Sequence, residues 1–225
     1  MYLDAKGVSV REKMLDFPAM KPTRLTREQS KDLTRERLLS AAHATFTKKG
    51  YVATSVEDIA SAAGYTRGAF YSNFRSKAEL LLELLRRDHE EAEADMQKIF
   101  ESGGTREQME AHALEYYSQF FRNSPAFLLW GEAKLQATRD AKFRARFNEF
   151  VKEKRDRFTH YILTFAERVG TPLLLPADVL ALGLMSLCDG VQSYHAADPR
   201  HVTGDAAQQV LAGFFARVVL GRAPD

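Results

Sequence analysis

The sequence predicts an all-α protein of nine helices, with a three-helix head on a body of longer helices. Two observations carry this prediction. Apolar residues recur at helical spacing almost everywhere from residue 30 onward, while the strict alternation of a half-buried strand is nearly absent. Capping residues and glycines then divide the periodic stretches into separate helices. With 225 residues, 45% of them hydrophobic, the chain is long enough for one or two domains with a core.

The first predicted helix covers about residues 30–49. Leu39, Ala42 and Phe46 fall on one face of it, at helical spacing. Gly50 supplies the stop signal, because glycine adopts the left-handed conformation that ends many helices.

Two short helices joined by a tight turn come next, which is the arrangement of a helix-turn-helix unit. The first lies in TSVEDIASAAG, with Ser55 as its N-cap, Asp58 as the capping-box partner and Gly64 at its end. Thr66 can cap the second, which covers residues 67–73. Helices of seven or eight residues are marginal alone, so apolar anchors must hold them in place.

Phe70 and Phe74 lie one turn apart and are expected to face the core. This orientation leaves four residues of the same helix outside: Arg67, Gly68, Tyr71 and Asn73. Arg67 can donate two hydrogen bonds to a guanine edge, and Asn73 can pair with adenine or a phosphate. Gly68 keeps the start of the helix slim enough to approach bases closely. Further residues of types that contact phosphates are Ser55, Tyr65, Tyr71 and Lys77.

The charge distribution indicates a polyanionic partner for this part of the chain. Residues 1–87 hold 16 Lys and Arg against 10 Asp and Glu, whereas residues 88–225 hold 16 against 20. Lys21, Arg24 and Arg27 precede the first helix and could form an arm that enters a minor groove. A disordered, solubilising tail explains the same charges equally well.

The stretch AAHATFTKKGYVATSVEDIASAAGYTRGAFYSNFRSKAELLLELL resembles the DNA-binding domain of TetR-family transcriptional regulators over residues 38–85, without a gap. The resemblance implies a TetR-like fold and DNA contacts from six residues: Ser55, Thr66, Arg67, Gly68, Tyr71 and Lys77. Ser72 and Asn73 depart from the His-Tyr or His-Phe pair that is frequent in the family. The phosphate contact of that histidine would then shift to Asn73.

The body is predicted from further caps and breaks. Ser76 and Glu79 repeat the capping device and begin a long helix to about residue 101. SGGT at 102–105 breaks it, and NSP at 123–125 ends the fifth helix. Four more helices are expected at about 125–137, 140–168, 177–196 and 203–220.

The last two predicted helices are apolar on nearly all sides, as in VLALGLMSLCDGV and VLAGFFARVVL. A helix of this kind must be buried all round, and one chain offers too few neighbours to do so. We therefore expect a homodimer in which helices 177–196 and 203–220 meet their symmetry mates as a four-helix bundle, as in TetR-like proteins.

The TetR resemblance also implies a small-molecule effector pocket in the body. Aromatic residues on helical spacing are mostly core, but the pocket would suit a flat or hydrophobic molecule. The expected lining residues are Tyr117, Phe121, Trp130, Glu132, Phe147 and Asp189. Asp189 lies in an apolar run and so needs a partner, either a ligand group, backbone donors or the dimer seam.

Several other classes are disfavoured. The single cysteine, Cys188, excludes an intramolecular disulfide and a multi-thiolate metal site. No apolar run reaches the length of a membrane span, and residues 1–20 lack a signal-peptide core, so a cytoplasmic location is expected. No glutamate lies three residues before a histidine, as a di-iron bundle requires, and no P-loop, G-x-S-x-G or H-E-x-x-H motif occurs. We expect no enzyme activity, metal or cofactor.

These observations predict a tail or basic arm (1–29), a helix-turn-helix domain (30–77) and an effector-binding and dimerisation domain (78–225). The predicted function is a ligand-released homodimeric repressor that binds double-stranded DNA at a palindromic operator. A transcriptional activator would have the same sequence features. A helical ligand-binding or scaffolding dimer that no longer reads DNA is the alternative from another class, and the unusual YSNF is the hint in its favour.

Overall fold

A computed structural model describes residues 26–105, 107–108, 111–112, 124–170 and 172–219. These residues form helices and connecting turns, with no strand among them, so the all-α prediction is confirmed. The helices are α1 (Arg27–Lys49), α2 (Val56–Ala62), α3 (Arg67–Tyr71), α4 (Lys77–Ser102), α6 (Ser124–Arg139), α7 (Ala141–Val169), α8 (Ala177–Ala197) and α9 (Gly204–Phe214), which continues into the π-helical turn η1 (Phe215–Val219). The predicted fifth helix lies largely outside the described residues.

Most of the predicted helix ends agree with the structure. Gly50 and Gly64 have positive φ angles of 80° and 75°, the conformation for which glycine is suited. The start of α1 differs, because the helix begins at Arg27 rather than near residue 30. Thr26 and Gln29 form a capping box there, with Gln29 N donating to Thr26 Oγ1 and Thr26 N donating to Gln29 Oε1. This first turn is polar and therefore carries no apolar period.

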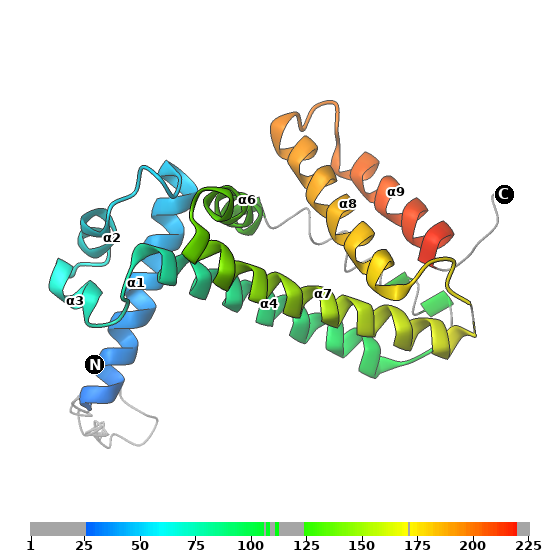
Figure 1. The fold of residues 1–225 in the computed structure, drawn as a ribbon, viewed down its shortest axis with the longest axis horizontal. Helices are drawn as coiled ribbons and strands as arrows, with labels where there is room; N and C mark the ends of the chain where they lie inside the picture. Colours follow the sequence, from blue (N-terminus) through cyan, green and yellow to red (C-terminus); the bar gives the residue numbers. More distant parts are fainter. Residues whose placement is uncertain (1–25, 106, 109–110, 113–123, 171, 220–225) are drawn as a thin grey trace, which may run out of the picture.

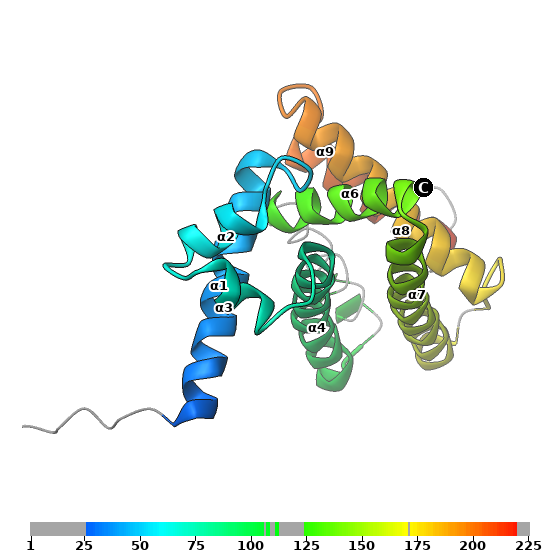
Figure 2. The same ribbon diagram turned by 60° about the vertical axis from the view of Figure 1, so that its left-hand side comes forward.

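The head, α1–α3, lies at one end of the molecule, and α4 and α7 run along its length (Figure 1). Helix α6 packs against α1, α4 and α7, and so touches both the head and the body. Helices α8 and α9 pair with each other, and α8 packs on α7 (Figures 1 and 2). None of the described helices is long and apolar enough to cross a membrane.

Two groups of buried side chains hold this arrangement. The first runs from the head into α4, α6 and α7, and includes Phe46, Ile59, Phe70, Trp130 and Phe150. The second joins α4, α7, α8 and α9 with η1, and includes Met96, Ile162, Leu184, Leu211 and Phe215. Because the first group crosses the predicted boundary at residues 77 and 78, the head has no core separate from the body.

Candidate nucleic-acid interface

The turn between α2 and α3 is built from local hydrogen bonds. Tyr65 N donates to Ala60 O at 2.8 Å, and Gly64 provides the left-handed residue that reverses the chain. Thr66 then caps α3 by accepting a hydrogen bond from Ala69 N at 3.3 Å. Tyr65 is partly buried and packs against the head core. The predicted roles of Gly64 and Thr66 in aiming α3 are therefore seen in the structure.

Helix α3 is held by aromatic anchors on one face and is open on the other. Phe70 and Phe74 are 0% and 1% exposed, and their ring centroids lie 5.8 Å apart. Arg67, Gly68 and Tyr71 are all exposed, Tyr71 to 47%. This division leaves a five-residue helix with a fixed position and a free outer surface.

Arg67 is the most prominent charge on that surface. Its Nη1 lies 2.6 Å from Glu57 Oε1 on α2, and its guanidinium lies over the Tyr71 ring, 5.5 Å from the centroid. A hydrogen bond to Tyr71 and the charge of Glu57 raise the pKa of Arg67, which stays protonated. The ion pair is exposed and weak, so a stronger acceptor can replace Glu57.

Asn73 is partly buried and does not face outward as the sequence suggested. Its Nδ2 donates to Ala69 O at 2.9 Å, and Arg35 Nη1 donates to its backbone oxygen at 2.9 Å. α3 ends at Tyr71, two residues before the predicted end, and this turns the Asn73 side chain back onto the helix. Ser72 is exposed, and its hydroxyl donates to Gly68 O.

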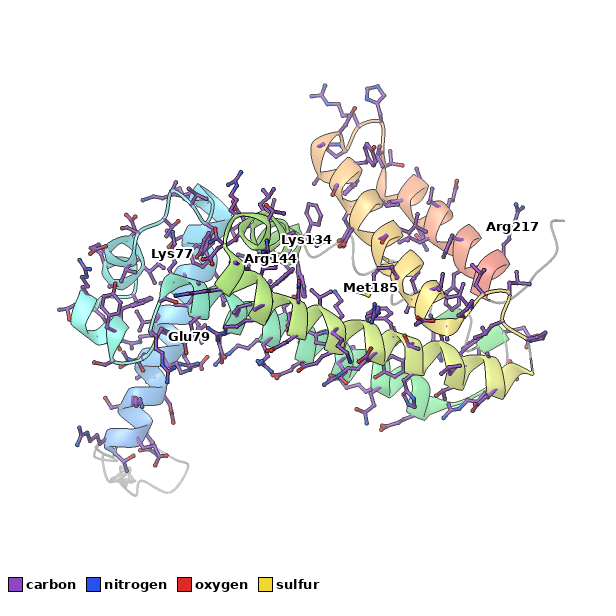
Figure 3. All side chains as sticks on the ribbon, viewed as in Figure 1. Lys77, Glu79, Lys134, Arg144, Met185 and Arg217 are labelled. Atoms are coloured by element: carbon purple, nitrogen blue, oxygen red, sulfur yellow. The ribbon has the colours of Figure 1, made fainter. Side chains whose placement is uncertain are left out.

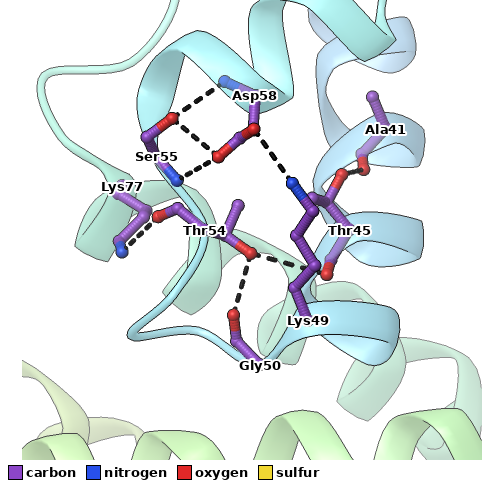
Figure 4. A network of polar contacts seen from close by, with 8 residues as sticks. All are labelled: Ala41, Thr45, Lys49, Gly50, Thr54, Ser55, Asp58 and Lys77. Carbon is purple, nitrogen blue, oxygen red and sulfur yellow. Dashed lines mark hydrogen bonds and ion pairs between the residues drawn. The ribbon is translucent and has the colours of Figure 1, made fainter.

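Lys77 and Ser55 belong to a polar network that ties the α1–α2 connection to α2 and α4 (Figure 4). Lys77 Nζ donates to Tyr51 O at 2.6 Å and to Thr54 O at 2.5 Å, and lies 4.3 Å from the Tyr51 ring centroid. Burial lowers the pKa of Lys77. Two of its three donors are thus used inside the head.

Ser55 and Asp58 form the predicted capping box of α2. Asp58 N donates to Ser55 Oγ at 3.0 Å, and Ser55 N donates to Asp58 Oδ2 at 2.9 Å. The Asp58 carboxylate accepts hydrogen bonds from Ser55 N, Ser55 Oγ and Lys49 Nζ, and these hold the pKa of Asp58 well below its usual range. The α4 cap differs: Ser76 Oγ accepts from Glu79 N as expected, but Glu79 Oε2 accepts from Arg75 N instead of Ser76 N.

The head is similar in sequence to known proteins. Residues 38–84 match the sequence profile described as "Bacterial regulatory proteins, tetR family". Residues 38–84 are therefore similar to the DNA-binding domain of TetR-family regulators. The regulator TtgR of Pseudomonas putida is 45% identical over 67 residues, which are 30% of this chain and 31% of TtgR. The match thus spans less than a third of that relative.

The whole TetR-like fold appears in solved structures. A TetR-family regulator from Rhodococcus sp. superposes with a TM-score of 0.69 at 19% identity, covering 84% of this chain and 99% of its own. A regulator from Saccharomonospora viridis, solved in complex with choline, gives 0.68 at 23% identity, covering 82% and 96%. At these identities the likeness shows the fold alone.

Within the body of the molecule, the predicted pocket residues do not all lie together. Trp130 and Phe147 are buried, with ring centroids 6.2 Å apart. Glu132 instead lies at the head, where a Cβ at Gly50 would be 2.8 Å from its Oε1. Asp189 Oδ2 pairs with Lys134 Nζ at 2.5 Å, which joins α8 to α6; Figure 3 shows Lys134 on α6. Tyr117 and Phe121 lie outside the described residues.

Sequence analysis missed three residues of the body that lie at or next to Trp130, two in contact with it and the third against its neighbour Phe150. Asp88 accepts a hydrogen bond from Trp130 Nε1 at 2.8 Å, Lys154 Nζ lies 4.2 Å from the indole centroid, and His89 is buried beside Phe150. Lys154 occurs in the charged run VKEKRDRF, where nothing distinguishes it from solvated neighbours. Within the described residues, no group of three or more His, Cys, Asp or Glu could hold a metal ion.

Proposed function

We propose that the protein is a sequence-specific DNA-binding transcriptional regulator that places α3 in the major groove. The outer surface of α3, with Arg67 and Tyr71 beside Gly68, carries this proposal. Arg67 can exchange Glu57 for a guanine edge, to which it donates two hydrogen bonds. Tyr71 lies beside it and can reach a phosphate. Such a regulator acts in the cytoplasm, where bacterial DNA lies, and needs no catalytic step.

Gly68 is the observation that favours an external partner. Its φ angle is not positive, and a Cβ there would meet only Thr66 Oγ1, at an ordinary 3.7 Å. The fold therefore does not require glycine, although glycine costs about 0.5–1 kcal/mol in a helix relative to alanine. A close approach of another molecule to α3 explains why this helix of five residues contains a glycine.

Two heads would be combined by a homodimer through α8 and α9. Exposed apolar side chains lie on these helices, with Val179 47%, Leu182 54% and Val210 49% exposed. Gly190 and Gly213 have open space where a side chain would stand, which permits close helix approach. A two-fold dimer would require a palindromic operator with half-sites about 34–36 Å apart, or a multiple of that distance. Light scattering should give a dimer for the protein and a monomer for Leu182→Glu.

Regulation would come from a ligand that binds the body. The continuous buried group from Phe46 and Phe70 to Trp130 and Phe150 offers a path by which the body can bias the head. A ligand that binds more tightly to the conformation in which the spacing of the two heads does not fit DNA would release the protein from its operator, as in a repressor. The structural relative bound to choline is one TetR-like body with a small-molecule ligand.

A mobility-shift assay with DNA flanking the protein's own gene tests the proposal. We expect a complex that specific competitor removes and scrambled competitor does not. Equal competition by both duplexes would favour the alternative of a ligand-binding dimer that does not read sequence. Transcription from the same promoter with and without the protein separates repressor from activator.

A further inference from the structure

We propose that Lys154, His89 and Trp130 form a subsite for the anionic end of an amphipathic carboxylate, which would be the effector. This inference rests on the proposed regulator function for the effector's role. The binding chemistry itself rests on three features of α4, α6 and α7: an unpaired cation, an unpaired buried imidazole nitrogen and the aromatic rings that bring them together.

Lys154 is a partly buried cation without a hydrogen-bonded partner. Its Nζ lies over the Trp130 ring, 4.2 Å from the centroid, and within the described residues it makes no hydrogen bond or ion pair. The two carboxylates whose charges act on Lys154 already have other partners. Asp189 pairs with Lys134 at 2.5 Å, and Asp88 accepts from the indole Nε1 at 2.8 Å. Burial lowers the pKa of Lys154, and a bound anion would offset that cost.

His89 supplies the second group. The residue is 8% exposed, and its Nε2 is buried with no hydrogen-bond partner among the described residues. A buried polar atom left unpaired costs about 1–3 kcal/mol, which a ligand oxygen would recover. Burial holds the pKa of His89 at about 4, so the ring is neutral at pH 7 and Nε2 can carry the donated proton.

Aromatic contacts place the two groups on one cluster. The His89 ring meets Phe150 edge-on with centroids 5.3 Å apart, and Phe150 stacks on Trp130 at 5.3 Å with an interplanar angle of 18°. Lys154 covers the same indole. The apolar part of the ligand would lie against this buried aromatic group, which continues through Phe147 to Phe143.

The charges favour an anion over a cation. The charges that act on His89 are positive and come from Lys154, Arg157 and Arg86. Two carboxylates, Asp189 and Asp88, act on Lys154, but they already pair with Lys134 and with the Trp130 indole. A cage for a quaternary ammonium needs a free aromatic face, whereas the Trp130 face already carries the Lys154 ammonium. A choline-like ligand would therefore be repelled at this place, whatever related bodies bind.

Trp130 is the only tryptophan of the chain, so its fluorescence reports binding at this cluster. Two matched series are titrated into the full-length protein at pH 7: decanoate, decanamide and decylamine, and 4-phenylbutyrate with its amide and amine. We expect at least one acid to bind about tenfold more tightly than its amide and its amine, as charge-assisted hydrogen bonds imply. His89→Leu should weaken the same acid more than its amide, because the hydrogen bond from His89 to a carboxylate is the stronger of the two.

Lys154→Met should abolish the preference for the acid, while Lys154→Arg should retain most of it. Lys152→Met is the control on the same helix, because Lys152 is exposed and pairs with Asp156 at 2.5 Å. The melting temperature of Lys154→Met without ligand should equal or exceed that of the wild type, since a partly buried charge without a hydrogen-bonded partner is removed and methionine can still pack on Trp130. This readout separates lost binding from lost folding.

The inference is overturned if the amides or amines bind as tightly as the acids, if none of the six compounds binds, or if Lys154→Met keeps the acid preference. The mobility-shift assay is run on the same preparations. Operator binding without acid binding would reject the subsite alone. Acid binding without operator binding would reject the proposed regulator and leave a carboxylate-binding protein.

Discussion

Arg67 Nη1 and Glu57 Oε1 lie 2.6 Å apart on the outer surface of the helix-turn-helix, with both side chains more than half exposed. The ion pair holds the guanidinium beside Tyr71 before any DNA is present. It also places one negative charge where a phosphate backbone would approach. DNA must therefore displace Glu57 from Arg67, and the pair weakens binding in proportion to its own strength.

Glu57→Gln should raise the affinity for operator and for unrelated duplexes, because it frees Arg67 and removes a charge that repels phosphates. The expected gain is about threefold to tenfold at low salt, since an exposed pair contributes about 0.2–1 kcal/mol and the lost repulsion adds to it. Fluorescence anisotropy over a salt series measures it. Glu153→Gln, which removes an exposed charge on α7, is the control and should change neither affinity.

Gly68→Ala should separate folding from DNA binding. The melting temperature should stay the same or rise slightly, because alanine stabilises a helix by about 0.5–1 kcal/mol relative to glycine. Operator affinity should fall by about tenfold or more if bases approach the helix within van der Waals distance. Gly64→Ala gives the converse result, since Gly64 has φ of 75°: lower stability, with the affinity of the folded fraction retained. Unchanged operator affinity in Gly68→Ala would remove the main reason for a close partner.

Lys77→Met should destabilise the protein by about 1–3 kcal/mol, because the carbonyl groups of Tyr51 and Thr54 lose their donor. Urea unfolding measures the loss, with Lys48→Met at an exposed position of α1 as the control. The salt dependence of DNA binding should match that of the wild type. A flatter salt dependence with full stability would instead restore Lys77 to the phosphate-contacting role that the sequence suggested.

His89 should make the protein less stable in mild acid. Burial, followed by the charges of Lys154, Arg157 and Arg86, lowers its pKa from 6.5 to about 4. The unfolded chain therefore binds a proton that the folded one excludes, so stability is fully present above pH 6.5 and falls as pH drops toward 4. The loss between pH 7 and pH 5 is about 2 kcal/mol. His89→Leu should abolish this part of the pH dependence in urea unfolding; an unchanged slope would mean that His89 titrates normally.

Local signals in the sequence were sufficient to predict most of the helix caps and buried anchors of the head. The Ser55–Asp58 capping box, the Thr66 cap and the anchors Phe70 and Phe74 depend on neighbours a few residues away, and the structure contains them all. The predicted start of α1 was wrong because the capping box of this helix precedes the first apolar residue of the periodic pattern. Ends of this kind are set by polar caps and carry no hydrophobic period.

Contacts between distant segments could not be predicted. Lys77 Nζ donates to Tyr51 O, and a Cβ at Gly50 would be 2.8 Å from Glu132 Oε1; both depend on how α4 and α6 pack on the head. Neither spacing nor residue type reveals that Lys154 lies over Trp130 while its neighbour Lys152 is solvated. Where a side chain could be either solvated or packed on another helix, only the tertiary structure decides between the two.

The most direct test of base reading by α3 is the specificity ratio of Arg67→Ala at one salt concentration. The ratio compares the affinity for the operator with that for a scrambled duplex of equal length, by fluorescence anisotropy, on protein shown to be folded and of wild-type oligomeric state. We expect Arg67→Ala to reduce operator affinity by about tenfold to a hundredfold and affinity for the scrambled duplex much less, because a bidentate base contact contributes about 1–3 kcal/mol of discrimination. An unchanged ratio would show that α3 does not read the bases.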